Sequence, residues 1–297
     1  MANSPAQAVL AQQRSETRIL WPLWIGIFAA LVLLLYGAIL KALVLDWWTD
    51  PNYGHGFLVP VFSAFVLWKE RQRLAQTKMK PANFGIFVML AAIGILLVGS
   101  LGAELFSTRC SLLVLLGGIV LFLAGWGMLR AIFFPLSFLV LMIPIPVLIY
   151  NQITFPLQLM ASRFATFWLQ LINVPVLREG NLIILPNYTL EVVDACSGIR
   201  SLMTLITLAI AYGYLVESKR WIRWFMVIIM VPIAIVSNSI RIFGAGLLTY
   251  HFGKDMAEGF FHEFSGWVIF VAALLLMFGC HWLLRKITRA GKEQSHA

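Results

Sequence analysis

The 297-residue sequence contains few charged residues for its length. Asp, Glu, Lys and Arg make up 12% of it, whereas 61% of the residues are hydrophobic and the mean hydropathy is +0.87. Soluble domains carry about twice that share of charge, so this composition excludes a soluble globular protein and predicts an integral membrane protein. The net charge of +9 does not indicate nucleic-acid binding, because the basic residues lie in short clusters between apolar runs.

The sequence also lacks the short motifs of several common sites. It has no pair of histidines one helical turn apart, no phosphate-binding loop and no Gly-x-Ser-x-Gly elbow. We therefore expect neither a metal ion nor another cofactor. The 3 cysteines are an odd number and cannot all pair within the chain. Cys110 and Cys280 fall at or within apolar runs, which is typical of packing residues.

Long apolar runs dominate what is present. Eight of them are long enough, or nearly long enough, to cross a bilayer: 20–45, 56–68, 84–102, 112–129, 132–150, 199–216, 224–250 and 264–284. The pattern predicts an all-α polytopic membrane protein with about eight transmembrane helices. We expect one transmembrane domain over 20–284, an N-terminal tail at 1–19 and a C-terminal tail at 285–297.

The basic clusters predict the orientation of these helices. They recur at alternate connections, notably at 69–80, 219–223 and 285–292, whereas the opposite connections are acidic and poor in lysine and arginine. Because basic connections remain in the cytoplasm, both tails are predicted to be cytoplasmic. The acidic connections then face outward, to the periplasm of a bacterium whose inner membrane holds the protein.

The apolar segment 155–172 does not fit this alternation. Gln158, Arg163 and Gln170 are spaced so that they could share one side of a helix. If the segment crossed the membrane, the basic connection at 219–223 would move to the outside. We therefore expect an interfacial or re-entrant helix on the outer side.

The stretch 191–202 places a thiol, two acids and an arginine beside apolar sequence. Residues 181–193 are typical of a short β-hairpin, and a helix is expected from about residue 199. Cys196 would then lie where a strand leads into a helix N-terminus, a setting that favours the reactive thiolate. The alternative is that Cys196 is a small buried residue chosen for packing.

The string from Ala195 to Leu202 resembles the cysteine motif of the exosortases, the bacterial branch of a family of membrane transpeptidases. The resemblance extends over about 46–267 and rests on three further matches, which are Tyr53-Gly54-His55-Gly56-Phe57-Leu58-Val59-Pro60, Asn238-Ser239-Ile240-Arg241, and His262 ahead of Ser265-Gly266-Trp267. It implies that Cys196 is the nucleophile, His262 the general acid and base, and Arg241 the donor that steadies the oxyanion.

The predicted topology agrees with this assignment. Cys196 and His262 would both lie at the outer surface, and Arg241 would lie about 13 Å below the outer end of its helix. An arginine within a membrane helix indicates a functional site by default, the alternative being an ion pair with Asp194 or Glu263. Supporting roles are predicted for four further residues, Arg200, Asp194, His55 and Asn238.

The resemblance implies a membrane-embedded cysteine transpeptidase within the lipid bilayer. Its substrates would be exported proteins with a C-terminal tail, made of a Pro-Glu-Pro-type motif, a transmembrane helix and a basic end. An acceptor attached to a lipid or polysaccharide would receive the cleaved protein. Two alternatives stay open: a purely hydrolytic membrane endopeptidase, and a non-enzymatic transporter or scaffold for exopolysaccharide export in which Cys196 is packed or bonded to Cys110.

Overall fold

The computed structural model describes residues 5–186, 188–192, 199–253 and 260–294, and side chains within 26–186, 188–192, 199–253 and 264–288. The chain forms two compact units. Unit 1 contains residues 1–50 and 56–144, and unit 2 contains residues 51–55 and 145–297. Each unit builds its own helical core, and the candidate site residues outside the masked segments lie in unit 2.

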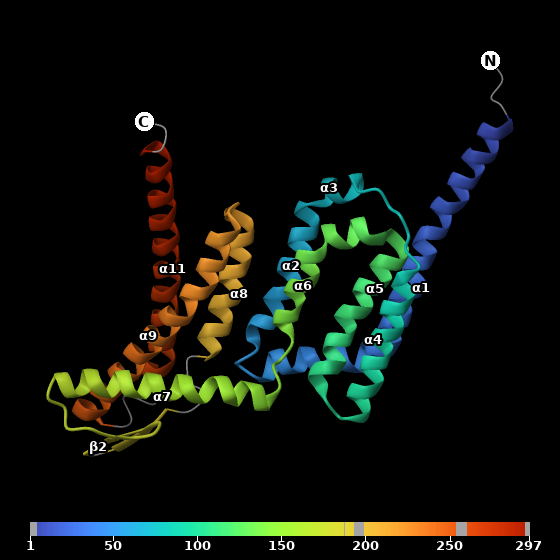
Figure 1. Cartoon of the computed structure of the whole chain (residues 1–297). Helices are drawn as coiled ribbons and strands as arrows, with labels where there is room; N and C mark the ends of the chain where they lie inside the picture. Colours follow the sequence, from blue (N-terminus) through green and yellow to red (C-terminus); the bar gives the residue numbers. More distant parts are fainter. Residues whose placement is uncertain (1–4, 187, 193–198, 254–259, 295–297) are drawn as a thin grey trace. The chain divides into compact units, whose positions relative to one another are not determined.

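Unit 1 is helical. Its elements are α1 (Pro5–Thr49), η1 (Gly54–Phe57, shared with unit 2), α2 (Leu58–Lys69), α3 (Arg71–Gln76), α4 (Phe84–Leu101), α5 (Leu105–Ala131), α6 (Phe133–Phe138) and η2 (Leu139–Met142). The pair α4 and α5 lies side by side (Figure 1). Their backbones approach closely at Gly85, which has no Cβ. A Cβ at this position would lie only 2.5 Å from the backbone nitrogen of Phe122. Close packing at small residues is a common way to join membrane helices, where apolar burial gives little drive.

A partly buried ion pair joins two helices of unit 1. Arg109 of α5 donates from Nη2 to Oδ2 of Asp46 on α1 at 2.5 Å, and Arg109 is only 3% exposed. Glu104 caps the start of α5 by accepting hydrogen bonds from the backbone N–H groups of Phe106 and Ser107. The side-chain hydrogen bond with Ser107, together with these backbone hydrogen bonds, holds the pKa of Glu104 below its usual value.

Unit 2 combines helices with a small sheet. Its elements are α7 (Val147–Leu171), β1 (Leu177–Glu179), β2 (Leu182–Leu185), β3 (Tyr188–Glu191), α8 (Ile199–Val216), α9 (Arg220–Phe252) and α11 (Phe260–Gln294). Helices α8, α9 and α11 pack together around Leu205, Met230 and Met277. Helix α7 runs across their ends rather than alongside them, with the sheet on its far side (Figure 1).

The buried face of α7 explains its position. Ala161, Ala165 and Leu169 recur at helical spacing and pack with Ile183 of β2 and Ile242 of α9. The opposite face of α7 exposes apolar side chains, including Phe164 and Phe167. This course is the one expected of a helix lying along a membrane surface, and that placement stays a prediction.

The structure confirms an all-α polytopic membrane protein, with a smaller number of spans than predicted. Among the described residues, six helices are long and apolar enough to cross a membrane, or seven if one bent pair is counted as a span. The run 56–68 forms only the short apolar stretch Gly54–Lys69. The run 132–150 is divided into α6, η2 and the start of α7, because prolines follow Ile143 and Ile145. The predicted hairpin is present and gains a third strand, β1.

Candidate active site

The cysteine motif lies between β3 and α8. The strand ends at Glu191 and the helix begins at Ile199, as the sequence predicts for a strand that leads into a helix. Asp194 and Cys196 lie outside the described residues. Their roles therefore stay predictions, and the geometry of the site is built from the elements on either side of them.

Arg241 lines a pocket formed by three helices of unit 2. Its polar wall is made by Ser201 of α8, Ser237, Asn238 and Arg241 of α9, and the backbone of α11 at Gly266. The rest of the wall is apolar, with Leu205, Ala234, Ile269, Phe270 and Ala273. The space that these residues border is about 280 Å³, and this figure includes space open to the outside. An arginine and an amide beside an apolar wall suit an anionic or developing negative charge next to an apolar chain.

Gly266 of α11 lies beside the guanidinium. A Cβ built on Gly266 would lie 3.7 Å from Nη1 of Arg241, so the arginine lies against the backbone of α11. His262 lies in the first turn of the same helix, one turn before Gly266, and its side chain is outside the described residues. The structure thus brings Arg241 and Asn238 together in one pocket, with α8 and the start of α11 beside them.

Arg200 occupies a different environment from its neighbour Ser201. Its Nε donates a hydrogen bond of 3.3 Å to Oδ1 of Asn52. Both residues line a second small pocket of unit 2 with Tyr53, Ile145, Tyr150, Ile199 and Met203. The sequence analysis predicted a supporting role for Arg200 but did not identify Asn52. The only local signal for Asn52 is its place directly before the Tyr53-Gly54-His55 motif.

His55 is buried at 7% exposure, in the short segment 51–55 that belongs to unit 2. The first part of the early motif, Tyr53 to His55, therefore belongs to the same unit as Arg241, although more than 180 residues separate them in the sequence. This location suits the supporting role predicted for His55.

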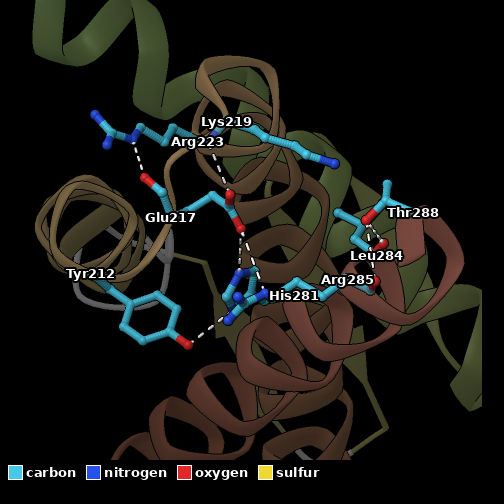
Figure 2. A network of polar contacts seen from close by, with 8 residues as sticks. All are labelled: Tyr212, Glu217, Lys219, Arg223, His281, Leu284, Arg285 and Thr288. Carbon is cyan, nitrogen blue, oxygen red and sulfur yellow. Dashed lines mark hydrogen bonds and ion pairs between the residues drawn. The ribbon is translucent and has the colours of Figure 1, made fainter. Parts of the chain in front are cut away.

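A second polar cluster lies at the other ends of the same helices (Figure 2). His281 of α11 is 3% exposed; its Nδ1 lies 2.9 Å from the Tyr212 hydroxyl and its Nε2 3.2 Å from Oε2 of Glu217. Arg285 approaches the same carboxylate at 3.9 Å. We call Tyr212, Glu217, His281 and Arg285 the Glu217 network.

The backbone around Glu217 extends this network. The N–H of Lys219 donates to Oε1 of Glu217 at 2.9 Å, and Nε of Arg223 donates to the Glu217 carbonyl at 2.6 Å (Figure 2). Burial alone would raise the pKa of the Glu217 carboxyl, but the hydrogen bonds from Lys219 and His281 hold that pKa below its usual value. The carboxylate is therefore ionised at neutral pH. The sequence analysis did not identify this network; the only local signal for it is one acid in an otherwise basic connection.

The described residues contain no group of three histidine, cysteine, aspartate or glutamate side chains that could hold a metal ion. Cys110 and Cys280 are free thiols. The alternative in which Cys110 is bonded to Cys196 stays untested, because Cys196 lies outside the described residues.

Comparison with known proteins identifies one family. The model of the transmembrane exosortase family matches residues 47–279, which is most of the chain. No curated protein and no solved structure matches it. The matched range contains the cysteine motif, Arg241 and His262, and ends shortly before His281.

Proposed function

Because the chain belongs to the transmembrane exosortase family, we propose that it is a cysteine transpeptidase that removes C-terminal sorting tails from exported proteins. Family membership supports a peptidase or transpeptidase role in protein sorting within a membrane. The cysteine mechanism, the tail and the acceptor are the further content of the proposal.

One observation supports the mechanism: the three helices that line the Arg241 pocket each carry, or directly follow, one residue of the predicted triad. Helix α8 follows the segment with Cys196, α9 carries Arg241, and α11 carries His262 in its first turn. Thiol-dependent peptide transfer needs a nucleophile, a proton carrier and a donor for the oxyanion, and these three residues supply one of each.

In the proposed reaction, the Cys196 thiol passes its proton to His262, and the resulting thiolate attacks the scissile carbonyl carbon. The carbonyl oxygen becomes an oxyanion, which the Arg241 guanidinium stabilises by donating hydrogen bonds. Collapse of this intermediate breaks the C–N bond and leaves a thioester. The imidazolium of His262 protonates the leaving amine and then, as a neutral base, activates the acceptor that releases the product and regenerates the thiol.

The proposed substrate is an exported protein anchored by a tail with a Pro-Glu-Pro-type motif, one transmembrane helix and a basic end. The Arg241 pocket combines polar groups with an apolar wall, which supports a substrate that approaches through the membrane. The acceptor is a nucleophile attached to a lipid or polysaccharide. If water takes its place, the enzyme is a membrane endopeptidase.

The proposed setting is the inner membrane of a bacterium, with both termini in the cytoplasm and the Arg241 pocket toward the periplasm. The arrangement of charge in unit 2 supports this orientation. Lys219, Arg223 and Arg285 gather around the Glu217 network, at the ends of α8 and α11 away from the Arg241 pocket. Basic residues at one end of a helix bundle favour the cytoplasmic side.

Co-expression with a tailed protein tests the proposal. The wild-type chain should remove the tail, and Cys196→Ala, expressed to the same level, should leave it intact. The intact mass of the product distinguishes water from a larger acceptor. Removal of the tail by well-folded Cys196→Ala would rule out the nucleophile, and the transporter or scaffold alternative would then take precedence.

A further inference from the structure

Strand β3 forms an edge of the sheet in unit 2. The strand order is β1-β2-β3, so within the described part of the chain β3 has β2 on one side and no strand on the other. Thr189 and Glu191 are exposed. No main-chain hydrogen bond outside the sheet involves either of them among the described residues. An unpaired edge of this kind is a ready template for another extended chain.

The register shows which backbone groups point outward. Val192 donates its N–H to the carbonyl of Asn181 at 3.0 Å, so the backbone of Val192 faces β2. Because backbone direction alternates along a strand, Tyr188 and Leu190 also face β2. The N–H and C=O groups of Thr189 and Glu191 therefore point to the open edge. Residues two apart repeat at about 6.8 Å, which matches the spacing of a paired extended peptide.

The strand is firmly held and leads into the candidate site. Val192 is fully buried and Leu190 packs against the same core as Ile242 of α9, one residue after Arg241. Beyond β3 the chain continues to the segment with Cys196 and then to α8, whose Ser201 lines the Arg241 pocket. A chain paired with β3 would thus run beside the strand that leads to the nucleophile.

We infer that the open edge of β3 binds the extended segment of the substrate around its cleavage point, by main-chain hydrogen bonds to Thr189 and Glu191. This inference rests on the proposed function. Strand addition gives affinity through the backbone and leaves side chains to confer specificity, so one enzyme can accept tails from many proteins. The edge therefore accounts for a broad substrate class that shares a short motif.

The pairing has a consequence for a Pro-x-Pro motif. Proline has no N–H and fits only where the backbone points away from the partner strand. Two prolines separated by one residue have the same alternation, so both can face away from β3 while the central residue pairs with it. The central residue and the second residue after it then contact β3, and the residue between them does not.

A binding experiment with Cys196→Ala protein in nanodiscs tests this pattern without requiring catalysis. The probe is a fluorescent synthetic peptide that carries a Pro-Glu-Pro motif and the residues after it, measured by anisotropy. N-methylation should weaken binding by about tenfold at the central Glu and at the second residue after it, because each change removes a hydrogen bond to β3. Methylation at the third residue after the Glu, which faces away from β3, should change affinity by less than about twofold.

A matched pair of enzyme variants tests the same edge. Thr189→Pro removes an outward N–H and leaves the bonds to β2 in place, so peptide affinity should fall by about fivefold at an unchanged melting temperature. Thr189→Ala keeps that N–H and should bind as the parent protein does. The inference would be overturned by affinity losses that are equal at paired and unpaired peptide positions, by equal effects of the two variants, or by no measurable binding.

Cleavage of the same peptides by wild-type protein tests the proposed function separately. Affinity losses that alternate along the peptide, without any cleavage, would support the edge site and reject the enzyme.

Discussion

Unit 2 contains two polar clusters on the same three helices, and they differ in where their polar groups point. In the Glu217 network, the imidazole of His281 has a partner at each nitrogen and the Glu217 carboxylate receives both a backbone N–H and the imidazole. In the Arg241 pocket, the guanidinium and Asn238 line a space with an apolar wall. Buried polar groups that satisfy one another contribute stability, whereas polar groups around a pocket are positioned for a ligand. We therefore expect the first cluster to contribute chiefly to stability, and we propose that the chemistry takes place at the second.

Replacing Arg241 should produce the largest effect. We expect Arg241→Ala to lower the rate of tail removal by about 100- to 1,000-fold, the usual cost of removing an oxyanion donor. The melting temperature in detergent should change little. Single-turnover cleavage and thermal melting of the purified variant measure the two properties separately.

Arg241→Lys is the matched control, because it keeps the charge but loses the planar set of donors. We expect it to recover only part of the rate. If Arg241→Ala instead unfolds the protein at unchanged activity per folded molecule, the arginine belongs with the structural cluster and the comparison fails.

Glu217→Ala should lower stability and leave the cleavage rate almost unchanged, the reverse of Arg241→Ala. It leaves His281 and Arg285 buried or half-buried without their carboxylate, at a cost of about 2–4 kcal/mol in the free energy of unfolding. Tail removal per folded molecule should stay close to that of the wild type. Glu70→Ala provides a control, because its carboxylate pairs with the exposed Arg73 and should matter by less than about 0.5 kcal/mol.

The stability that Glu217 contributes should change with pH in a defined direction. Since the folded state lowers the pKa of this carboxyl, its stabilising contribution is fully present above the unfolded value near 4.5 and is lost as the pH falls through the folded value. The difference in melting temperature between wild type and Glu217→Gln should therefore be constant from about pH 5.5 to 7 and should shrink below about pH 4.5. A difference that grows on acidification would contradict the network.

His281 allows the two bonds of the network to be separated. Asparagine places a polar group near Nδ1 and keeps the contact with Tyr212, whereas glutamine reaches the position of Nε2 and keeps the contact with Glu217. Because a hydrogen bond to a charged group is the stronger one, His281→Gln should cost about 1 kcal/mol less than His281→Asn. Thermal melting of the two variants measures this order, and the reverse order would make Tyr212 the more important partner.

The sequence predicted the local features of the molecule better than the distant ones. The predicted run 199–216 coincides with α8, because hydropathy along one helix is a local property. Arg241 was identified for the same reason, as a charge within an apolar helix. The Glu217 network was not predicted, because Tyr212 and His281 lie 69 residues apart and no local pattern joins them. The share of Ser201 and Gly266 in the pocket likewise depends on how α8 and α11 pack against α9.

The smaller number of candidate spans has a different cause. Hydropathy alone does not show where an apolar run changes direction. Residues 132–150 form three elements because Pro144 and Pro146 interrupt the helix, so α7 begins within the predicted run. The prediction of one domain over 20–284 stays a prediction, since the contacts describe two units and their arrangement relative to each other is not determined.

Gly266→Ala should have the smallest effect on activity of the substitutions considered, together with a gain rather than a loss of stability. The new methyl group would lie at an ordinary contact distance of 3.7 Å from Nη1 of Arg241, so α11 should pack as before. Alanine is the better helix former, and we expect a gain of up to about 0.5–1 kcal/mol in stability. Because the methyl group narrows the pocket beside the guanidinium, cleavage should slow by about two- to fivefold, chiefly through a higher KM.

The same substitution at Gly279, a position on α11 where an added Cβ would meet nothing within 4 Å, should raise stability without changing KM. A stabilised Gly266→Ala enzyme with an unchanged KM would show that substrate does not enter beside Arg241, and the division between a stabilising cluster and a chemical cluster would then rest on Arg241 alone.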